Sequence, residues 1–132
     1  MTKSTISQYT EHFQNYPRLM SCLEYVLGSL PEEIKSELLS DPNFKVALDD
    51  YRPGQGRFVL MPNLGPGGGS RCVVLKPRLE KCSDKFSKYI IAHELAHAFL
   101  YNRGWKEISD PEEAADALAA HWGYEKVPFE FV

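Results

Sequence analysis

The first third of the chain carries apolar residues at helical spacing. From residue 17 to residue 30 they are separated by one, three or four positions, which predicts a helix that begins at Pro17. A second short helix is expected after Pro31. The polar segment 5–16 is either a further helix or a loose arm, and residues 40–43 have the composition of a turn. The apolar positions of the two helices are Leu19, Met20, Leu23, Val26, Leu27 and Leu30, then Ile34, Leu38 and Leu39.

The middle of the chain changes to short apolar runs that are typical of strands. Residues 44–48 alternate with period two, and residues 57–61 and 71–76 form two further runs, the last rich in β-branched residues. Turn-forming residues at 53–56 separate the first two runs, and a longer segment, 62–70, separates the last two. We therefore expect a small three-stranded sheet that is mainly antiparallel.

The last third of the chain is helical again. Ser83 is a suitable N-cap for a long helix, with Arg103 in its last turn and Gly104 as its stop. A second helix is expected from Asp110 to Trp122, ending at Gly123, because Asp-Pro-Glu-Glu is a strong helix start. The order of helices, strands and helices predicts an α+β fold. We expect one domain over residues 1–132, with a helical part at 1–41, a sheet at 42–82 and a helical pair at 83–124.

Composition and charge exclude several classes of protein. The chain has 132 residues, of which 43% are hydrophobic and 25% charged, as in ordinary globular domains. A net charge of −3 without a basic stripe argues against nucleic acid as the ligand. No apolar run approaches the ~18 residues of a membrane span, and the polar N-terminus does not resemble a secretion signal. The three cysteines lack metal-site spacing, so we expect reduced thiols and a cytoplasmic protein.

Residues 93–97 read HELAH and carry the most informative chemistry in the chain. The two histidines are four residues apart and therefore share one helix face, where both imidazoles can reach one Zn²⁺. Glu94 is placed to act as a general base on a water molecule whose pKa the metal lowers. Two helical histidines can also lie at the surface or be hydrogen-bonded in a core. The flanking residues are apolar, however, and burying these side chains without partners would cost several kcal/mol, so we favour a metal site.

A catalytic zinc needs a third protein ligand and an open position. The next predicted helix offers Glu112, Glu113, Asp116 and His121. Glu113 already has a role as the capping partner of Asp110. His121 lies nine residues after Glu112, on the opposite face, so the two cannot both be ligands. Glu112 and Asp116 share a face, and we favour Glu112 as the ligand and Asp116 as a carboxylate that holds a histidine N–H. The alternative for both acids is pairing with the helix dipole.

These two blocks resemble a known family. HELAH followed by EEAADALAA from residue 112 is similar to the gluzincin metallopeptidases, most of all to the ImmA/IrrE type, whose pattern is HExxH and then ExxA(N/D)xFA. Leu118 replaces the usual phenylalanine of the second block. The resemblance covers roughly residues 71–124 and implies a minimal zincin-like domain, one zinc ion per chain bound by His93, His97 and Glu112, and Glu94 as the catalytic base.

The chain also departs from that family. Its length leaves no room for the helix-turn-helix or sensory domain that members often carry, and the first 70 residues resemble no family. Larger gluzincins take a tyrosine or histidine from a downstream subdomain to stabilise the oxyanion. Tyr101 and Tyr124 are the local candidates for this role, although a helical tyrosine more often packs in a core.

The sequence thus predicts a zinc-dependent peptidase that acts on a protein or peptide, with one regulatory protein as the expected substrate. The run at 71–76 could pair with an extended substrate. Two alternatives stay open: a non-catalytic zinc-containing module that binds a protein, and a toxin, antirepressor or other phage or mobile-element accessory protein that acts on one host target. The oligomeric state is not predicted. We expect the glycine-rich segment 65–70 to be a strand connection, and Cys82 to be a free thiol that does not bind the zinc.

Overall fold

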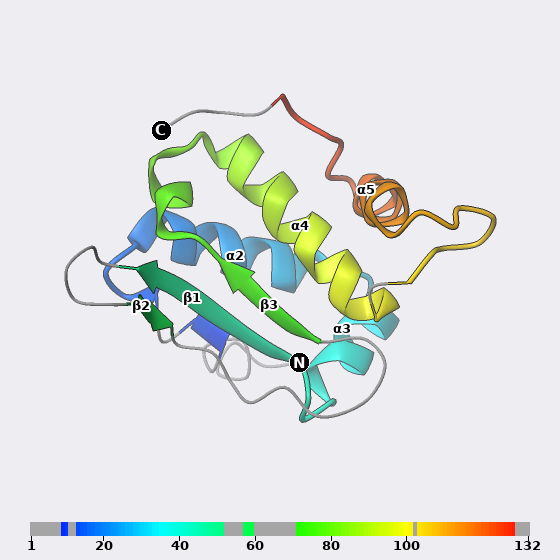
Figure 1. Ribbon diagram of the computed structural model, residues 1–132, viewed down its shortest axis with the longest axis horizontal. Helices are drawn as coiled ribbons and strands as arrows, with labels where there is room; N and C mark the ends of the chain where they lie inside the picture. The colour runs from blue at the N-terminus through cyan, green and yellow to red at the C-terminus, as the bar shows by residue number, and fades with distance from the viewer. Residues whose placement is uncertain (1–8, 11–12, 52–56, 60–70, 102, 129–132) are drawn as a thin grey trace.

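The computed structural model describes residues 9–10, 13–51, 57–59, 71–101 and 103–128 (Figure 1). The expected order of helices, strands and helices is confirmed, and so is the α+β class. The glycine-rich segment 65–70, for which we predicted a strand connection, lies outside the described residues, and so does half of the polar segment 5–16, for which we predicted either a helix or a loose arm. The elements are α2 (Pro17–Ser29), α3 (Glu32–Leu39), β1 (Lys45–Tyr51), β2 (Arg57–Val59), β3 (Cys72–Leu75), the 3-10 helix η2 (Pro77–Lys81), α4 (Asp84–Leu100) and α5 (Pro111–His121).

The three strands form one sheet in the order β2-β1-β3, and the expected mainly antiparallel pairing is wrong. Strand β1 pairs antiparallel with β2, from Asp49 opposite Val59 onward, but parallel with β3 over four residue pairs. The reason is that β2 reverses the direction of the chain on one side of β1, and β3 reverses it again on the other side, so β3 runs in the same direction as β1. Strand β1 is therefore central, and β3 is an edge strand among the described strands.

The helices α2 and α4 lie on the same side of this sheet and share its core (Figure 1). Alternate residues of β3 are buried, as expected for a strand with one covered face. Helix α4 also contacts α5, α2, α3 and β3, and ten of its seventeen residues are buried. The element that carries the HELAH motif is thus held from several sides. The core joins Leu19, Leu23, Val26, Leu27, Val46, Leu48, Val73, Leu75, Ile91 and Leu95.

The start of α4 was predicted correctly and its end was not. The Ser83 hydroxyl accepts a hydrogen bond from the Phe86 N–H at 3.2 Å, as an N-cap should. The helix ends at Leu100, and Tyr101 takes the left-handed conformation with φ 56°. Gly104 is therefore not the stop of the helix, and Arg103 does not lie in its last turn.

Glycine at position 104 is explained by the turn that follows it. The N–H groups and carbonyls of Trp105 and Ile108 form a tight bridge with distances of 2.8 and 2.9 Å. A Cβ atom at position 104 would lie 2.3 Å from the Ile108 carbonyl oxygen. Glycine is required here because the backbone of the turn approaches so closely.

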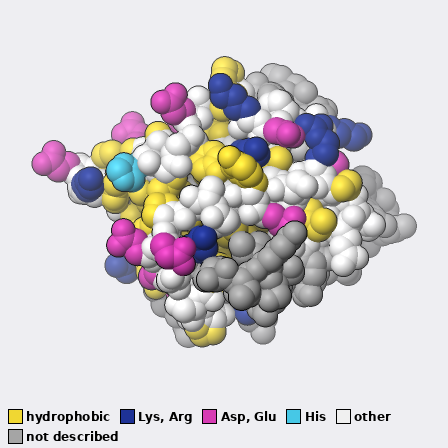
Figure 2. All heavy atoms as spheres, turned by 180° about the vertical axis from the view of Figure 1, so that it is seen from behind, with side chains coloured by type: hydrophobic (Ala, Val, Ile, Leu, Met, Phe, Trp, Pro, Cys, Tyr) yellow, Lys and Arg dark blue, Asp and Glu magenta, His cyan; other side chains and the backbone are white. Residues whose placement is uncertain are grey.

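No helix in the described part of the chain is long and apolar enough to cross a membrane. Figure 2 shows the molecule from behind the view of Figure 1. On this face acidic and basic side chains are interspersed, and the basic side chains of the residues drawn in colour form no continuous surface.

Candidate metal centre

Helix α4 places two imidazoles in the interior. His93 and His97 are each only 9% exposed, and their Nε2 atoms lie 3.1 Å apart. The rings meet edge to face, at 4.7 Å between centroids. The four-residue spacing predicted this shared face.

Helix α5 supplies a carboxylate to the same point. Its start is fixed by Asp110, whose side chain accepts a hydrogen bond from the Glu113 N–H at 3.0 Å, and the predicted cap is confirmed. The residues that α5 buries are small except for one: Ala114, Ala115, Leu118 and Ala119. Short side chains let two helices approach closely. As a result Glu112, which is otherwise exposed, reaches His93 and His97 on α4.

The three possible metal ligands, His93, His97 and Glu112, form a compact group. Glu112 Oε1 lies 3.1 Å from His93 Nε2, and Glu112 Oε2 lies 3.1 Å from His97 Nε2. Their possible ligand atoms all lie within 4.8 Å of one another. Two ligands bound to zinc at ~2.0–2.1 Å with tetrahedral angles would be ~3.3 Å apart. The observed spacing is close to that value, so a small cation fits among these atoms.

The proton on His93 makes a cation at this point favourable. His93 Nδ1 lies 2.8 Å from Asp116 Oδ1, and because a carboxylate only accepts, Nδ1 must be the donor. In the neutral ring Nε2 then carries a lone pair, and that lone pair faces a Glu112 oxygen. Two acceptors in contact repel each other unless a positive charge lies between them. A second proton on His93 would relieve this one contact, whereas a metal ion would satisfy all three residues together.

Asp116 holds His93 in place and is itself held. Its Oδ1 also accepts a hydrogen bond from the Tyr89 hydroxyl at 2.6 Å, and Lys126 Nζ lies 3.8 Å from its Oδ2. Sequence reasoning proposed Asp116 for this position but did not name Tyr89 as part of the site. The available signal was the spacing, because Tyr89 precedes His93 by four residues and so shares its face.

The pKa values of Asp116 and Glu112 both lie below their ordinary values. Burial raises the pKa of Asp116, but hydrogen bonds from Tyr89 and His93 outweigh burial and hold the pKa below its ordinary value. Burial likewise raises the pKa of Glu112, and contacts with His97 and His93 lower it by more. Both groups therefore keep their negative charge, which suits a metal ligand and its supporting carboxylate.

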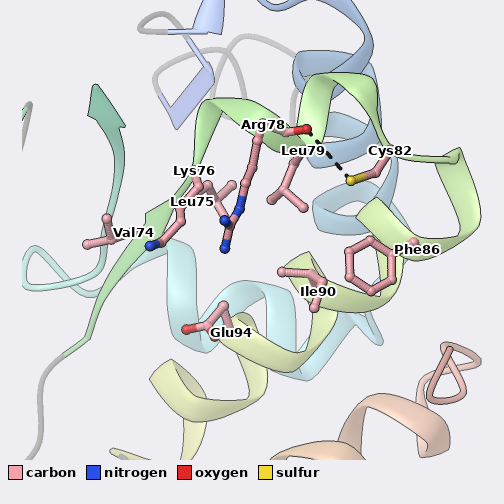
Figure 3. Close-up of a pocket in the computed structure, with 9 residues that line it drawn as sticks. All are labelled: Val74, Leu75, Lys76, Arg78, Leu79, Cys82, Phe86, Ile90 and Glu94. Atoms are coloured by element: carbon pink, nitrogen blue, oxygen red, sulfur yellow. Dashed lines mark hydrogen bonds between the residues drawn. The ribbon is translucent and has the colours of Figure 1, made fainter. Parts of the chain in front are cut away.

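Glu94 faces a different environment from its neighbours on α4. Its side chain lines a pocket between β3, η2 and α4 (Figure 3), and it does not join the three-residue group. Burial raises its pKa, although His93 and His97 act in the opposite direction. A carboxylate with a raised pKa beside a metal site is suited to accept and return a proton.

The remaining predicted residues are engaged elsewhere. The Tyr124 hydroxyl lies 2.5 Å from Ser29 Oγ, and the Tyr101 ring packs under the guanidinium of Arg71 at 3.9 Å. His121 is exposed, and its ring lies 5.7 Å from that of Trp105 between centroids, tilted by 54°. Cys82 is buried and forms no disulfide, as expected, and its thiol donates to the Arg78 carbonyl at 3.6 Å.

Comparison with known protein families, with curated proteins and with solved structures finds no match to this chain.

Proposed function

We propose that this chain is a zinc-dependent peptidase with a minimal zincin-like, gluzincin-type site, similar to the ImmA/IrrE enzymes. The observation that carries the proposal is the convergence of His93, His97 and Glu112 on one point, with a lone pair of His93 turned toward a carboxylate. The three residues would bind one zinc ion per chain, and Asp116 would fix the tautomer and orientation of His93.

The proposed reaction needs only water as a co-reactant. A bound zinc ion supplies Lewis acidity, which polarises a carbonyl group and lowers the pKa of water. Glu94 accepts a proton from the attacking water while the water oxygen bonds to the carbonyl carbon. The same carboxyl group then gives the proton to the leaving amine as the C–N bond breaks.

The edge strand offers a way to hold an extended substrate. Strand β3 pairs with β1 on one side, and among the described strands none pairs with its other edge. A peptide laid along that edge would gain main-chain hydrogen bonds. Because Glu94 lines the same pocket as Val74 and Leu75 of β3, such a peptide would run beside Glu94.

The engagement of both tyrosines favours a second candidate function, a zinc-binding interaction module without catalysis. With Tyr101 under Arg71 and Tyr124 on Ser29, neither proposed oxyanion donor is directed to the site. Loss of one such donor typically slows acyl transfer by 10²–10³-fold. A site of this kind would bind metal and substrate but hydrolyse slowly.

The Glu94→Gln variant separates the two functions. Glutamine keeps the shape of the side chain but cannot accept a proton at neutral pH, so a peptidase should lose hydrolysis by ~10²–10⁴-fold while zinc content and melting temperature stay unchanged. The measurement is cleavage of a proteome-derived peptide library followed by mass spectrometry, with Glu125→Gln, an exposed site on the C-terminal segment, as the control. Equal cleavage by the parent and Glu94→Gln would remove the proposed base. A zinc-loaded parent that cuts no peptide would favour the interaction module.

A further inference from the structure

The pocket beside Glu94 has a volume of about 180 Å³ and opens next to the proposed base. Figure 3 shows its wall built from three successive elements: the end of β3, the η2 segment and the part of α4 from Phe86 to Glu94. None of its lining residues comes from α5, so the pocket does not depend on the helix that carries Glu112. Its lining residues are Val74, Leu75, Lys76, Arg78, Leu79, Cys82, Phe86, Ile90 and Glu94.

The inner wall of this pocket is apolar. Leu75, Leu79 and Phe86 are all buried, and Phe86, Ile90 and Glu94 follow one another at four-residue spacing along one face of α4. An apolar cavity of about 150 Å³ holds a benzene ring. The pocket therefore fits one large apolar side chain, such as phenylalanine or leucine, rather than a whole small molecule, whose sites usually start near 300 Å³.

Two cationic residues, Lys76 and Arg78, border this apolar pocket. Both are exposed, and the Arg78 side chain extends from η2 in the direction of Glu94 (Figure 3). Among the described residues, no carboxylate forms an ion pair with either of them.

The acidic residues that lie nearest in the sequence are already engaged. Glu80 accepts hydrogen bonds from the Leu19 N–H at 2.8 Å and the Arg18 N–H at 3.2 Å, and so caps the start of α2. Asp84 pairs with the Arg18 guanidinium at 2.7 Å. Within the described part of the chain, the positive charge at the pocket is therefore left for a ligand.

We propose that this pocket selects peptide segments in which a large apolar residue lies next to an acidic one. The apolar side chain would enter the pocket, and the neighbouring carboxylate would contact Arg78 and Lys76. The pocket would select substrates only if the chain is the peptidase proposed above, and the inference rests on that function to this extent. An extended peptide on the edge of β3 would then pass the pocket on its way to Glu94. Binding to the pocket itself needs no metal.

The test uses blocked, fluorescein-labelled hexapeptides and the 132-residue chain treated with a chelator, so that nothing is cleaved. One peptide carries phenylalanine beside glutamate, a second carries glutamine in place of glutamate, and a third carries alanine in place of phenylalanine; both residue orders are made. We expect the glutamate peptide to bind about threefold to tenfold more tightly than the glutamine peptide at low salt, and the difference to shrink at high salt. The alanine peptide should bind more weakly than either.

Variants assign the charge effect to the pocket. The double variant Lys76→Gln and Arg78→Gln should lose the preference for glutamate, while Lys81→Gln, an exposed lysine of the same segment that does not line the pocket, should keep it. Equal binding of both peptides to the parent, or a preference that survives in the double variant, would overturn the inference.

A cleavage arm keeps the two proposals distinguishable. If the zinc-loaded parent discriminates between the peptides in binding but cuts none, the selective pocket stands and the peptidase proposal fails. If it cuts peptides without any preference for an acidic neighbour, the peptidase proposal stands and the selective pocket fails.

Discussion

The contact between Asp116 and His93 allows a quantitative test of the metal centre. Replacing Asp116 by alanine removes the acceptor at 2.8 Å from His93 Nδ1 but leaves His93, His97 and Glu112 unchanged. Loss of such a supporting carboxylate usually weakens metal binding 10–100-fold, which corresponds to about 1.4–2.7 kcal/mol. Asp116→Asn should lose less, because its amide oxygen can still accept from His93.

Tyr89 provides the second arm of this experiment. Its hydroxyl donates to the same Asp116 oxygen at 2.6 Å. Because Tyr89 acts on the zinc only through Asp116, we expect Tyr89→Phe to weaken zinc binding by about threefold to tenfold, which is about 0.7–1.4 kcal/mol and lies within the net range of one ordinary hydrogen bond. If Tyr89 acts only through Asp116, it should have no further effect on affinity once Asp116 is alanine. Lys126→Gln is the control, because Lys126 is 74% exposed and lies 3.8 Å from Asp116, so its ion pair should contribute little.

The assay is competition for zinc against a chromogenic chelator, with a thermal melt of each variant to show that the fold is retained. The four proteins of the cycle are the parent, Tyr89→Phe, Asp116→Ala and the double variant, and non-additivity between the two positions measures their coupling. Unchanged zinc affinity in Asp116→Ala would refute the supporting role of this carboxylate. An equal loss from Tyr89→Phe in both backgrounds would show that Tyr89 acts independently of Asp116.

Other substitutions test the third ligand and the glycines. Glu112→Ala should abolish stoichiometric zinc binding measured by metal analysis, whereas Glu113→Ala, which keeps the N–H that Asp110 accepts, should stay zinc-loaded; the opposite pattern would assign the ligand to Glu113. Gly104→Ala should lower the free energy of unfolding by about 1–3 kcal/mol, because its Cβ would lie 2.3 Å from the Ile108 carbonyl oxygen. Gly123→Ala should lower the free energy of unfolding by about 1–2 kcal/mol through its φ of +102° alone, since its Cβ meets no atom within 4 Å. Denaturant unfolding of both glycine variants measures these values. If Gly104→Ala left the free energy of unfolding unchanged, the close approach at position 104 would be contradicted.

Local spacing predicted most of what lies within single helices. Ser83 and Asp110 cap the helices that their sequence context indicated. The four-residue steps placed His93 beside His97, and brought Glu112 and Asp116 to the same histidine, His93. Each of these features depends on residues three or four positions apart, where helical geometry leaves little freedom.

Features that depend on distant residues could not be read in the same way. The parallel pairing of β1 with β3 follows from where the chain re-enters the sheet after β2, which no short pattern encodes. Likewise, the Tyr124 hydroxyl meets Ser29 across 95 residues of sequence. The end of α4 was missed for a different reason: Tyr101 adopts the left-handed conformation that usually favours glycine, and the nearby Gly104 therefore gave a misleading signal.

The small side chains that α5 buries have a consequence for the metal-free protein. Three alanines and one leucine remove little apolar surface from water, so hydrophobic burial alone holds α5 weakly. A zinc ion shared between α4 and α5 would join the two helices directly, and at a free concentration one thousand times its Kd it would stabilise the folded state by about 4.1 kcal/mol. Amide hydrogen exchange along α5 should therefore slow on zinc addition far more than exchange in α2, which is held by the main core. In such a protein, the supply of metal would control how long the last helix stays docked.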